Sequence, residues 1–312
     1  MVQDINNEFE LEDSLVSDSN NKKATRSIWV SAFVNLCLSA VQIVVGIFSH
    51  SQGLVADGIH SLSDLGADFV ALVATWKSKQ KADENYHYGY KRYENLASLI
   101  LGVLLLVVGI GMLWSAVQKL QNPESIPTVQ TVALWTALLA LIAKELLFRY
   151  MLAVAKLVKS SMLIANAWHA RSDAASSLIV AIGIIGNISG LPILDPIAAL
   201  IVGFVVGKMG WTFMWDAMQD LLDKSVSEEE VIAIGNEIRE TQGVIGFHEL
   251  KTRKSGDMIL ADVHLELDAK MTVAEGHAIA NKVKENVMTK YQVLYIMIHV
   301  DPVYIDEPKG IV

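Results

Sequence analysis

The chain has 312 residues, of which 52% are hydrophobic and only 19% charged, and its mean hydropathy is positive. This composition excludes an ordinary soluble protein of this size and predicts a membrane protein. The formal net charge of −9 argues against nucleic acid as a partner. The single cysteine, Cys37, excludes a disulfide framework within the chain.

The first 24 residues are polar and acidic. They lack the basic start and the cleavage site of a signal peptide. We expect residues 1–24 to form a disordered tail without catalytic content.

Six apolar stretches of about 20 residues or more follow this tail. They predict an all-α membrane domain, a six-helix bundle over residues 25–222. The expected spans are Ser27–Phe48, Gly53–Trp76, Leu96–Val117, Val129–Leu152, Met162–Ile188 and Ile193–Trp215.

Basic residues gather in alternate connections of this bundle. They lie before the first span, after the second and after the fourth, at Lys22, Lys23, Arg26, Lys77, Lys79, Lys81, Lys91, Arg92, Lys156 and Lys159. In the other three connections the only lysine or arginine is Lys119. The positive-inside bias therefore places both termini and the long second loop in the cytoplasm. Without a signal sequence, this compact architecture favours a bacterial inner membrane.

The second and fifth spans carry the same polar motif. His60 and Asp64 are four residues apart in the second span, as are His169 and Asp173 in the fifth. Residues at this spacing share one helix face. Two such faces offer two imidazoles and two carboxylates, a suitable ligand set for a tetrahedral divalent ion such as zinc. The ion would also neutralise carboxylates that are costly to bury unpaired.

A structural hydrogen-bond network is the alternative explanation for one such motif, and its repetition on a second span favours the metal site. The roles of five other polar residues stay open. Asp57 and Asp68 either touch the metal path or solvate a polar cavity. Arg171 is rotated off the ligand face, toward a lipid headgroup or another helix. Asn35 and Gln42 either line the cavity or form hydrogen bonds between helices.

From residue 223 onward the pattern becomes that of a soluble domain, residues 223–312. An acidic first turn after Ser227 opens a helix, and two strands follow, joined by a turn at Ser255–Gly256. Thr272 and Glu275 have the spacing of a capping box that opens a second helix, and a third strand follows. The order α-β-β-α-β predicts a cytoplasmic α+β, ferredoxin-like domain with its helices on one face of a small sheet.

Four of the eight histidines lie in this domain, at His248, His264, His277 and His299. Strand alternation places His264 on a polar face with Asp262 and Glu266, while Val263 and Leu265 face the core. The same rule places His299 and Asp301 on one face. By itself, a histidine on such a face is more often a surface residue than a ligand.

The paired HxxxD motifs, the six spans and the C-terminal domain resemble those of the cation diffusion facilitator family. The resemblance covers nearly the whole chain after the tail. It implies homodimeric efflux of a divalent metal in exchange for protons, with His60, Asp64, His169 and Asp173 as the transport site. It also implies a regulatory two-metal site in the cytoplasmic domain, whose ligand positions are the residues His248, His264, His277, His299 and Asp301.

The loop after the second span departs from the family pattern. Tyr86 and Tyr90 stand where zinc-binding relatives carry histidine, so Asp83 and the displaced His87 form at most a weak metal site. Arg92 matches a basic position that in relatives pairs with an acidic residue after the sixth span, here Asp223.

The function that follows is divalent metal efflux by alternating access, with metal, protons, a second copy of the chain and the lipid membrane as partners. Zinc is the favoured ion, and no prosthetic group is expected. Iron, cobalt, cadmium, nickel and manganese remain alternatives. The alternative function is a non-transporting metal sensor or partner subunit of a related transporter, which the tyrosines of the loop favour. An enzyme is not expected, because the HExxH arrangement and a poised nucleophile are lacking.

Overall fold

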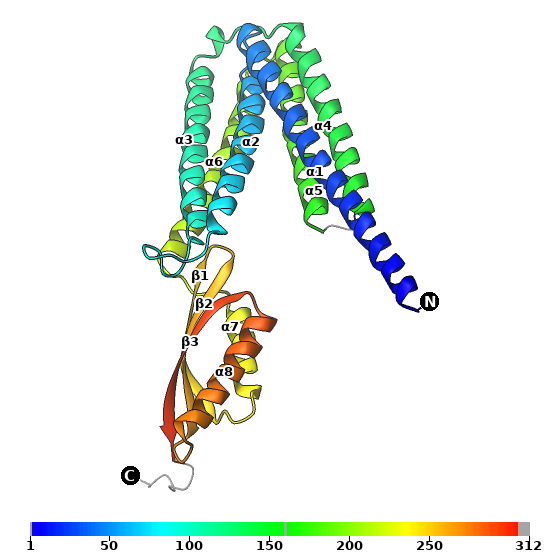
Figure 1. The fold of residues 1–312 in the computed structure, drawn as a ribbon. Helices are drawn as coiled ribbons and strands as arrows, with labels where there is room; N and C mark the ends of the chain where they lie inside the picture. Colours follow the sequence, from blue (N-terminus) through cyan, green and yellow to red (C-terminus); the bar gives the residue numbers. More distant parts are fainter. Residues whose placement is uncertain (1, 159–160, 305–312) are drawn as a thin grey trace. The chain divides into compact units, whose positions relative to one another are not determined.

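The structure is a computed structural model that describes residues 2–158 and 161–304 (Figure 1). Met1, residues 159–160 and residues 305–312 lie outside the described part. They include Lys159 of the predicted basic loop and the end of the expected C-terminal domain.

Six long helices precede the C-terminal domain. They are α1 (Val2–Phe48), α2 (Gln52–Ser78), α3 (Tyr93–Gln121), α4 (Thr131–Leu157), α5 (Ser161–Ile188) and α6 (Leu194–Leu221), with a short 3-10 helix, η1 (Pro123–Ser125), before α4. Each expected span falls on one of these helices, so the predicted six-helix architecture is confirmed.

Four of these helices are long and apolar enough to cross a membrane on length and composition alone: α1 from Thr25, α3, α4 and α6. Within the described ranges, α2 and α5 do not reach that apolar content. These are the two helices that carry the HxxxD motifs, and their histidine, aspartate and serine side chains lower their hydropathy.

Helix α1 begins at Val2 and therefore includes the segment for which the sequence predicts a disordered tail. No glycine or proline precedes Gly46. Because these two residues are the strongest helix breakers, the backbone has no local reason to leave the helix before the first span.

The chain divides into two compact units. The first contains Met1–Phe69 and Val103–Trp211, and the second contains Val70–Gly102 and Thr212–Val312. Helices α2, α3 and α6 therefore run from one unit into the other.

In the first unit, α4 and α5 pack against each other and α1 packs on α4 (Figure 1). Phe148, Met151 and Ala170 belong to the buried cluster between them. Helices α3 and α6 approach closely at Gly109, where an added Cβ atom would lie 2.5 Å from the backbone nitrogen of Gly207. Small residues allow such close approach between membrane helices.

The C-terminal domain consists of α7 (Glu228–Glu240), β1 (Gly246–Ser255), β2 (Met258–Asp268), α8 (Val273–Lys290) and β3 (Val293–Val303). Its sheet has the order β1-β2-β3, with β1 antiparallel and β3 parallel to β2. The predicted α-β-β-α-β order and ferredoxin-like fold are confirmed. Capping boxes at Ser227 and Thr272 begin the two helices.

Both helices cover one face of the sheet (Figure 1). Val263 and Leu265 of β2, with exposures of 1% and 0%, pack into one core with Ile234 of α7 and Val283 of α8. Residues that alternate with Val263 and Leu265 along β2 therefore point away from the helices, onto an open face of the sheet.

Candidate functional site

The motif residues of α2 and α5 meet inside the first unit. Ligand atoms of His60, Asp64 and Asp173 all lie within 4.8 Å of one another, and His60 Nδ1 is 3.4 Å from Asp64 Oδ2. His60 is 3% exposed, and the Asp64 side chain is 16% exposed. We call these three residues the membrane ligand group.

Two atoms of this group are buried without a hydrogen-bond partner, His60 Nδ1 and Asp64 Oδ2. Buried polar atoms normally have such partners, and an unpaired one carries the full cost of its desolvation. A divalent cation would satisfy both atoms at once. Imidazole nitrogen together with carboxylate oxygen is a ligand set that suits transition metals and zinc.

His169, the fourth predicted ligand, lies one turn before Asp173 on α5 and is exposed, outside this group. Asp68, one turn beyond Asp64 on α2, is also exposed. The i, i+4 spacing still places His169 on the same helix face as Asp173.

Asp57 belongs to a separate buried network that also contains Gln42, Lys144 and Ser177. Its carboxylate accepts hydrogen bonds from Gln42 Nε2, from Ser177 Oγ at 2.6 Å and from Lys144 Nζ, which is 3.3 Å from both oxygens. Lys144 Nζ also donates to Ser177 Oγ at 2.7 Å. We call these four residues the Asp57 network. Since its carboxylate oxygens are paired here, Asp57 is not placed as a metal ligand.

Arg171 lies over two aromatic rings, with its guanidinium carbon 5.0 Å from the ring centre of Phe148 and 5.2 Å from that of Trp168. Phe148 is on α4. Of the two roles considered for Arg171, the structure therefore shows the contact between helices, with a favourable cation–π component.

The C-terminal histidines are brought together by a β-bulge in β1. His248 pairs with His264 of β2, but Lys251 is the next residue to pair, with Asp262. The extra residue is accommodated at Glu249, which has a φ of 51°. Such a bulge bends the strand and changes the direction of nearby side chains. As a result, His248 and Lys251 are both exposed.

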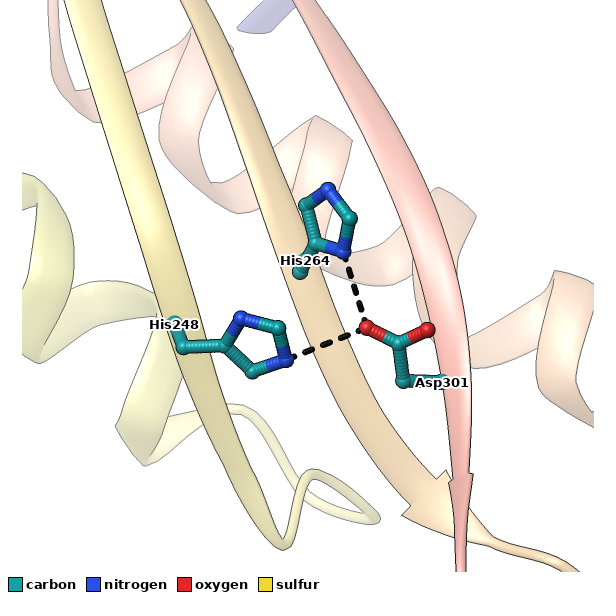
Figure 2. A group of neighbouring side chains, drawn as sticks. All are labelled: His248, His264 and Asp301. Carbon is teal, nitrogen blue, oxygen red and sulfur yellow. Dashed lines mark hydrogen bonds and ion pairs between the residues drawn. The ribbon is translucent and has the colours of Figure 1, made fainter.

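Figure 2 shows His248, His264 and Asp301 converging from three strands. Asp301 Oδ2 is 2.8 Å from His264 Nδ1 and 3.1 Å from His248 Nε2, and His299 Nε2 is 3.3 Å from Asp301 Oδ1. The parallel register of β2 and β3 sets His264 beside His299. We call these four residues the histidine cluster.

The histidine cluster fits a regulatory metal by its donor chemistry. Ligand atoms of His248, His264 and Asp301 lie within 4.8 Å of one another. The hydrogen bond with His264, together with the nearby imidazoles, holds the pKa of Asp301 below its usual value. The carboxylate is therefore ionised at neutral pH, the form in which it binds zinc.

His277 is not part of this cluster. It lies on α8, which covers the opposite face of the sheet, and its Nε2 atom is 3.0 Å from the Asn281 side-chain nitrogen. Within one chain the core of the domain separates helix α8 from the outer face of β2, so the structure does not bring His277 to the other three histidines, and its role as a metal ligand stays a prediction.

In the loop between α2 and α3, Asp83 forms local hydrogen bonds. One oxygen accepts from the backbone nitrogens of Asn85 and Tyr86, each at 2.9 Å, and the other from Tyr90 Oη at 2.5 Å. This last bond raises the pKa of Tyr90 to about 12. In the described chain, neither residue of the expected weak site, Asp83 or His87, belongs to a group that could hold a metal.

The predicted contact between Arg92 and Asp223 is present, and both side chains are about half exposed. A neighbouring contact, which sequence analysis did not identify, is more buried. Asn95, only 6% exposed, donates to Asp220 at 3.0 Å and accepts from the backbone nitrogen of Gly256 at 2.8 Å. Asn95 thereby ties the β1–β2 turn to the start of α3.

Lys144 is the main residue of the membrane domain that the sequence analysis missed. It stands in the fourth span, between Ala143 and Glu145, in an otherwise apolar run. A buried lysine needs a counter-ion, and an unassigned aspartate on a neighbouring span is the natural partner. The sequence alone does not select Asp57 as this partner, because Glu145 is adjacent to Lys144 and several other aspartates lie in the membrane helices.

Two family models match the chain. One, for the cation efflux transmembrane domain, matches residues 28–222, and the other, for the cytoplasmic domain of cation efflux proteins, matches residues 226–303. The chain belongs to the cation efflux, or cation diffusion facilitator, family. The family resemblance inferred from the two HxxxD motifs is thereby confirmed.

Among its relatives, the magnetosome protein MamB of Magnetospira sp. (strain QH-2) is 34% identical over 261 residues, which are 83% of this chain and 88% of MamB. The manganese efflux system protein MneS of Bacillus subtilis (strain 168) is 30% identical over 281 residues, 90% of this chain and 96% of MneS. A solved MamM C-terminal domain is 25% identical, with a TM-score of 0.24, and the match covers 24% of this chain and 98% of that one.

Membership of this family establishes a multi-pass membrane protein that transports divalent metal cations. It is a family of transporters, not of enzymes. The membrane ligand group and the histidine cluster are two groups of side chains that have the donor chemistry to hold a metal ion.

Proposed function

We propose that this cation efflux protein exports zinc in exchange for protons, by alternating access, as a homodimer. The observation that carries the proposal is the membrane ligand group, in which His60 Nδ1 and Asp64 Oδ2 are buried 3.4 Å apart without a hydrogen-bond partner. Two carboxylates of opposite helices, Asp64 and Asp173, neutralise a divalent ion, and His169 completes the ligand set from the same face of α5.

Zinc is favoured by the two imidazoles, which suit zinc better than manganese. Manganese is the second candidate, because MneS, a relative 30% identical to this chain, is by name a manganese efflux protein. Competition among zinc, manganese, iron, cobalt, cadmium and nickel in one flux assay separates these possibilities. We expect zinc to inhibit uptake of the other ions most strongly.

Proton exchange follows from the same ligands. Imidazoles and carboxylates bind metal only when deprotonated, so protons at the outer face compete with the bound ion and release it. We place both termini in the cytoplasm and the protein in a bacterial inner membrane, on the distribution of basic residues between the connections.

The histidine cluster acts in this proposal as a regulatory site. Metal that binds the cytoplasmic domain only in its native, dimerised form stabilises that form, by the linkage between binding and folding. A rise in cytoplasmic metal would therefore favour the transporting dimer.

The test is flux of zinc into proteoliposomes under an imposed pH gradient. Asp64→Ala and Asp173→Ala each remove one charge that the cation needs, and we expect flux to fall to the level of empty vesicles. Glu145→Ala is the matched control, because Glu145 is an acidic residue of a membrane helix that pairs with the exposed Arg149. Wild-type flux in both aspartate variants would disprove the site.

The alternative, a non-transporting sensor or partner subunit, rests on the tyrosines of the α2–α3 loop. It predicts that the pure protein binds zinc but shows no flux unless a related transporter is added. Flux by this chain alone in the same vesicles excludes it.

A further inference from the structure

We infer that the Asp57 network is the gate that closes the proposed transport site toward the α1–α2 and α5–α6 connections, and that Lys144 is the residue that holds it shut. This inference rests on the proposed alternating-access function. It assigns a role to a buried lysine that neither binds metal nor belongs to the HxxxD motifs.

The Asp57 network lies beside the predicted metal ligands along both α2 and α5. Asp57 precedes His60 by three residues on α2, and Ser177 follows Asp173 by four residues on α5. At about 1.5 Å per residue, the network lies roughly 5 Å beyond the nearest ligands. On both helices the displacement is toward the α1–α2 and α5–α6 connections.

The side chains of the Asp57 network are more buried than the predicted metal ligands. Gln42 is 0% exposed, and the Asp57 and Lys144 side chains are 1% and 2% exposed. In the other direction, Asp64 is half-buried and His169 is exposed. The ligand group is therefore closed on the side of the network and more accessible on the side of Asp64 and His169.

A layer of buried apolar side chains lies beyond the Asp57 network. Ala140 is one turn before Lys144 on α4, and Val180 and Ile184 follow Ser177 on α5; all three are 0% exposed. This layer is apolar and tightly packed. An ion that leaves in this direction must pass both the layer and the ammonium group of Lys144, which repels cations.

Lys144 joins the helices that must separate. Its ammonium group, on α4, contacts Asp57 of α2 and Ser177 of α5, and Gln42 adds α1 through Asp57. Opening on this side requires α2 to part from α4 and α5, and the ion pair breaks when they do. Water then hydrates both charges, so an ion pair forms a gate that opens more readily than an apolar plug of the same size.

Removing one charge and removing both therefore have opposite effects. Lys144→Met leaves the Asp57 carboxylate buried and unpaired while the gate is closed, which favours the open, hydrated state. The double variant Asp57→Asn with Lys144→Met leaves a neutral, well-packed closure, which favours the closed state. A residue that merely positions the metal ligands would not produce this change of sign.

The experiment measures chemical access to the thiol of the variant Ala140→Cys in a Cys37→Ser background. A membrane-impermeant thiol reagent is added to proteoliposomes on the face that carries the α1–α2 and α5–α6 connections, and protease cleavage of the C-terminal domain scores orientation. We expect Lys144→Met to raise the modification rate about tenfold or more, and the double variant to leave it at or below the parent rate. Arg149→Met, which breaks an exposed ion pair on the same helix, is the control.

A modification rate within about twofold of the parent in Lys144→Met, or an equal rise in the double variant, would overturn the gate. If Lys144→Met does not fold, the charge-exchanged pair Asp57→Lys with Lys144→Asp decides: it restores the parent rate if the ion pair is the gate. Because the readout needs no metal, its failure differs from failure of the flux assay on Asp64→Ala.

Discussion

The histidine cluster predicts that zinc stabilises the cytoplasmic domain through His264 but not through His277. The perturbation is His264→Ala in residues 224–304, a segment with its own apolar core. His264 Nδ1 lies 2.8 Å from Asp301 Oδ2, whereas His277 lies on α8 on the other side of the core. His277→Ala is therefore a control of the same chemistry in the same domain.

The magnitude follows from binding linkage. Zinc at a hundred times its dissociation constant stabilises the native state by about 2.7 kcal/mol. For a domain of this size that corresponds to a rise in Tm of roughly 10–20 °C, at about 4–8 °C per kcal/mol. Sites with four ligands bind zinc with about 10–16 kcal/mol, or roughly 3 kcal/mol per ligand, which is more than a hundredfold in affinity. At the same zinc concentration, His264→Ala should therefore keep a shift of only about 2–3 °C.

The assay is thermal unfolding followed by circular dichroism, with and without zinc. Because His264 is only half-buried and lies on the open face, the metal-free Tm of His264→Ala should stay close to that of the parent. A full zinc shift in His264→Ala, or an equal loss in His277→Ala, would refute the assignment of the cluster.

Three further predictions concern the cytoplasmic domain and its contact with α3. Leu265→Ala, at a position with 0% exposure, should lower the free energy of unfolding in urea by about 2–5 kcal/mol. Ser227→Ala should cost about 1 kcal/mol at neutral pH. The Ser227 hydroxyl also donates to the Glu230 carboxylate and holds its pKa below its usual value. This part of the cost is present above about pH 4.3 and lost as pH falls through the folded pKa, so the two urea midpoints should move closer together in acid. They should not coincide, because Ser227 Oγ still accepts the capping bond from the Glu230 backbone nitrogen in the parent. Asn95→Ala should speed hydrogen exchange at the Gly256 amide, which loses its acceptor, and an unchanged rate would contradict that contact.

Much of the site could be predicted from periodicity. The i, i+4 spacing of His60 and Asp64 sets both on one helix face whatever surrounds the helix, and the alternation of β2 sets His264 opposite Val263. These are local consequences of backbone geometry. For this reason the fold order and the open histidine face agree with the sequence analysis.

The features that could not be predicted from the sequence depend on tertiary contacts or on rare backbone conformations. The bulge at Glu249 needs a positive φ at a glutamate, for which the sequence carries no glycine or asparagine as a signal. His277 follows a well-formed capping box, yet only the packing of α8 decides which face of the sheet it covers. Lys144 was missed because the choice of its partner, Asp57, depends on how α2, α4 and α5 pack.

The charges inside the first unit also constrain how transport can be coupled to protons. Lys144 is paired with Asp57, so it does not neutralise Asp64 or Asp173. A bound divalent ion balances those two carboxylates, and the loaded site is neutral. Without the ion, two unpaired carboxylates would have to be buried when the bundle changes conformation, at a cost of several kcal/mol each. We therefore expect the empty carrier to change conformation only after protons have replaced the metal on these carboxylates. Because Lys144 stays paired with Asp57 and cannot neutralise them, metal and protons are exchanged, and the metal does not leak freely.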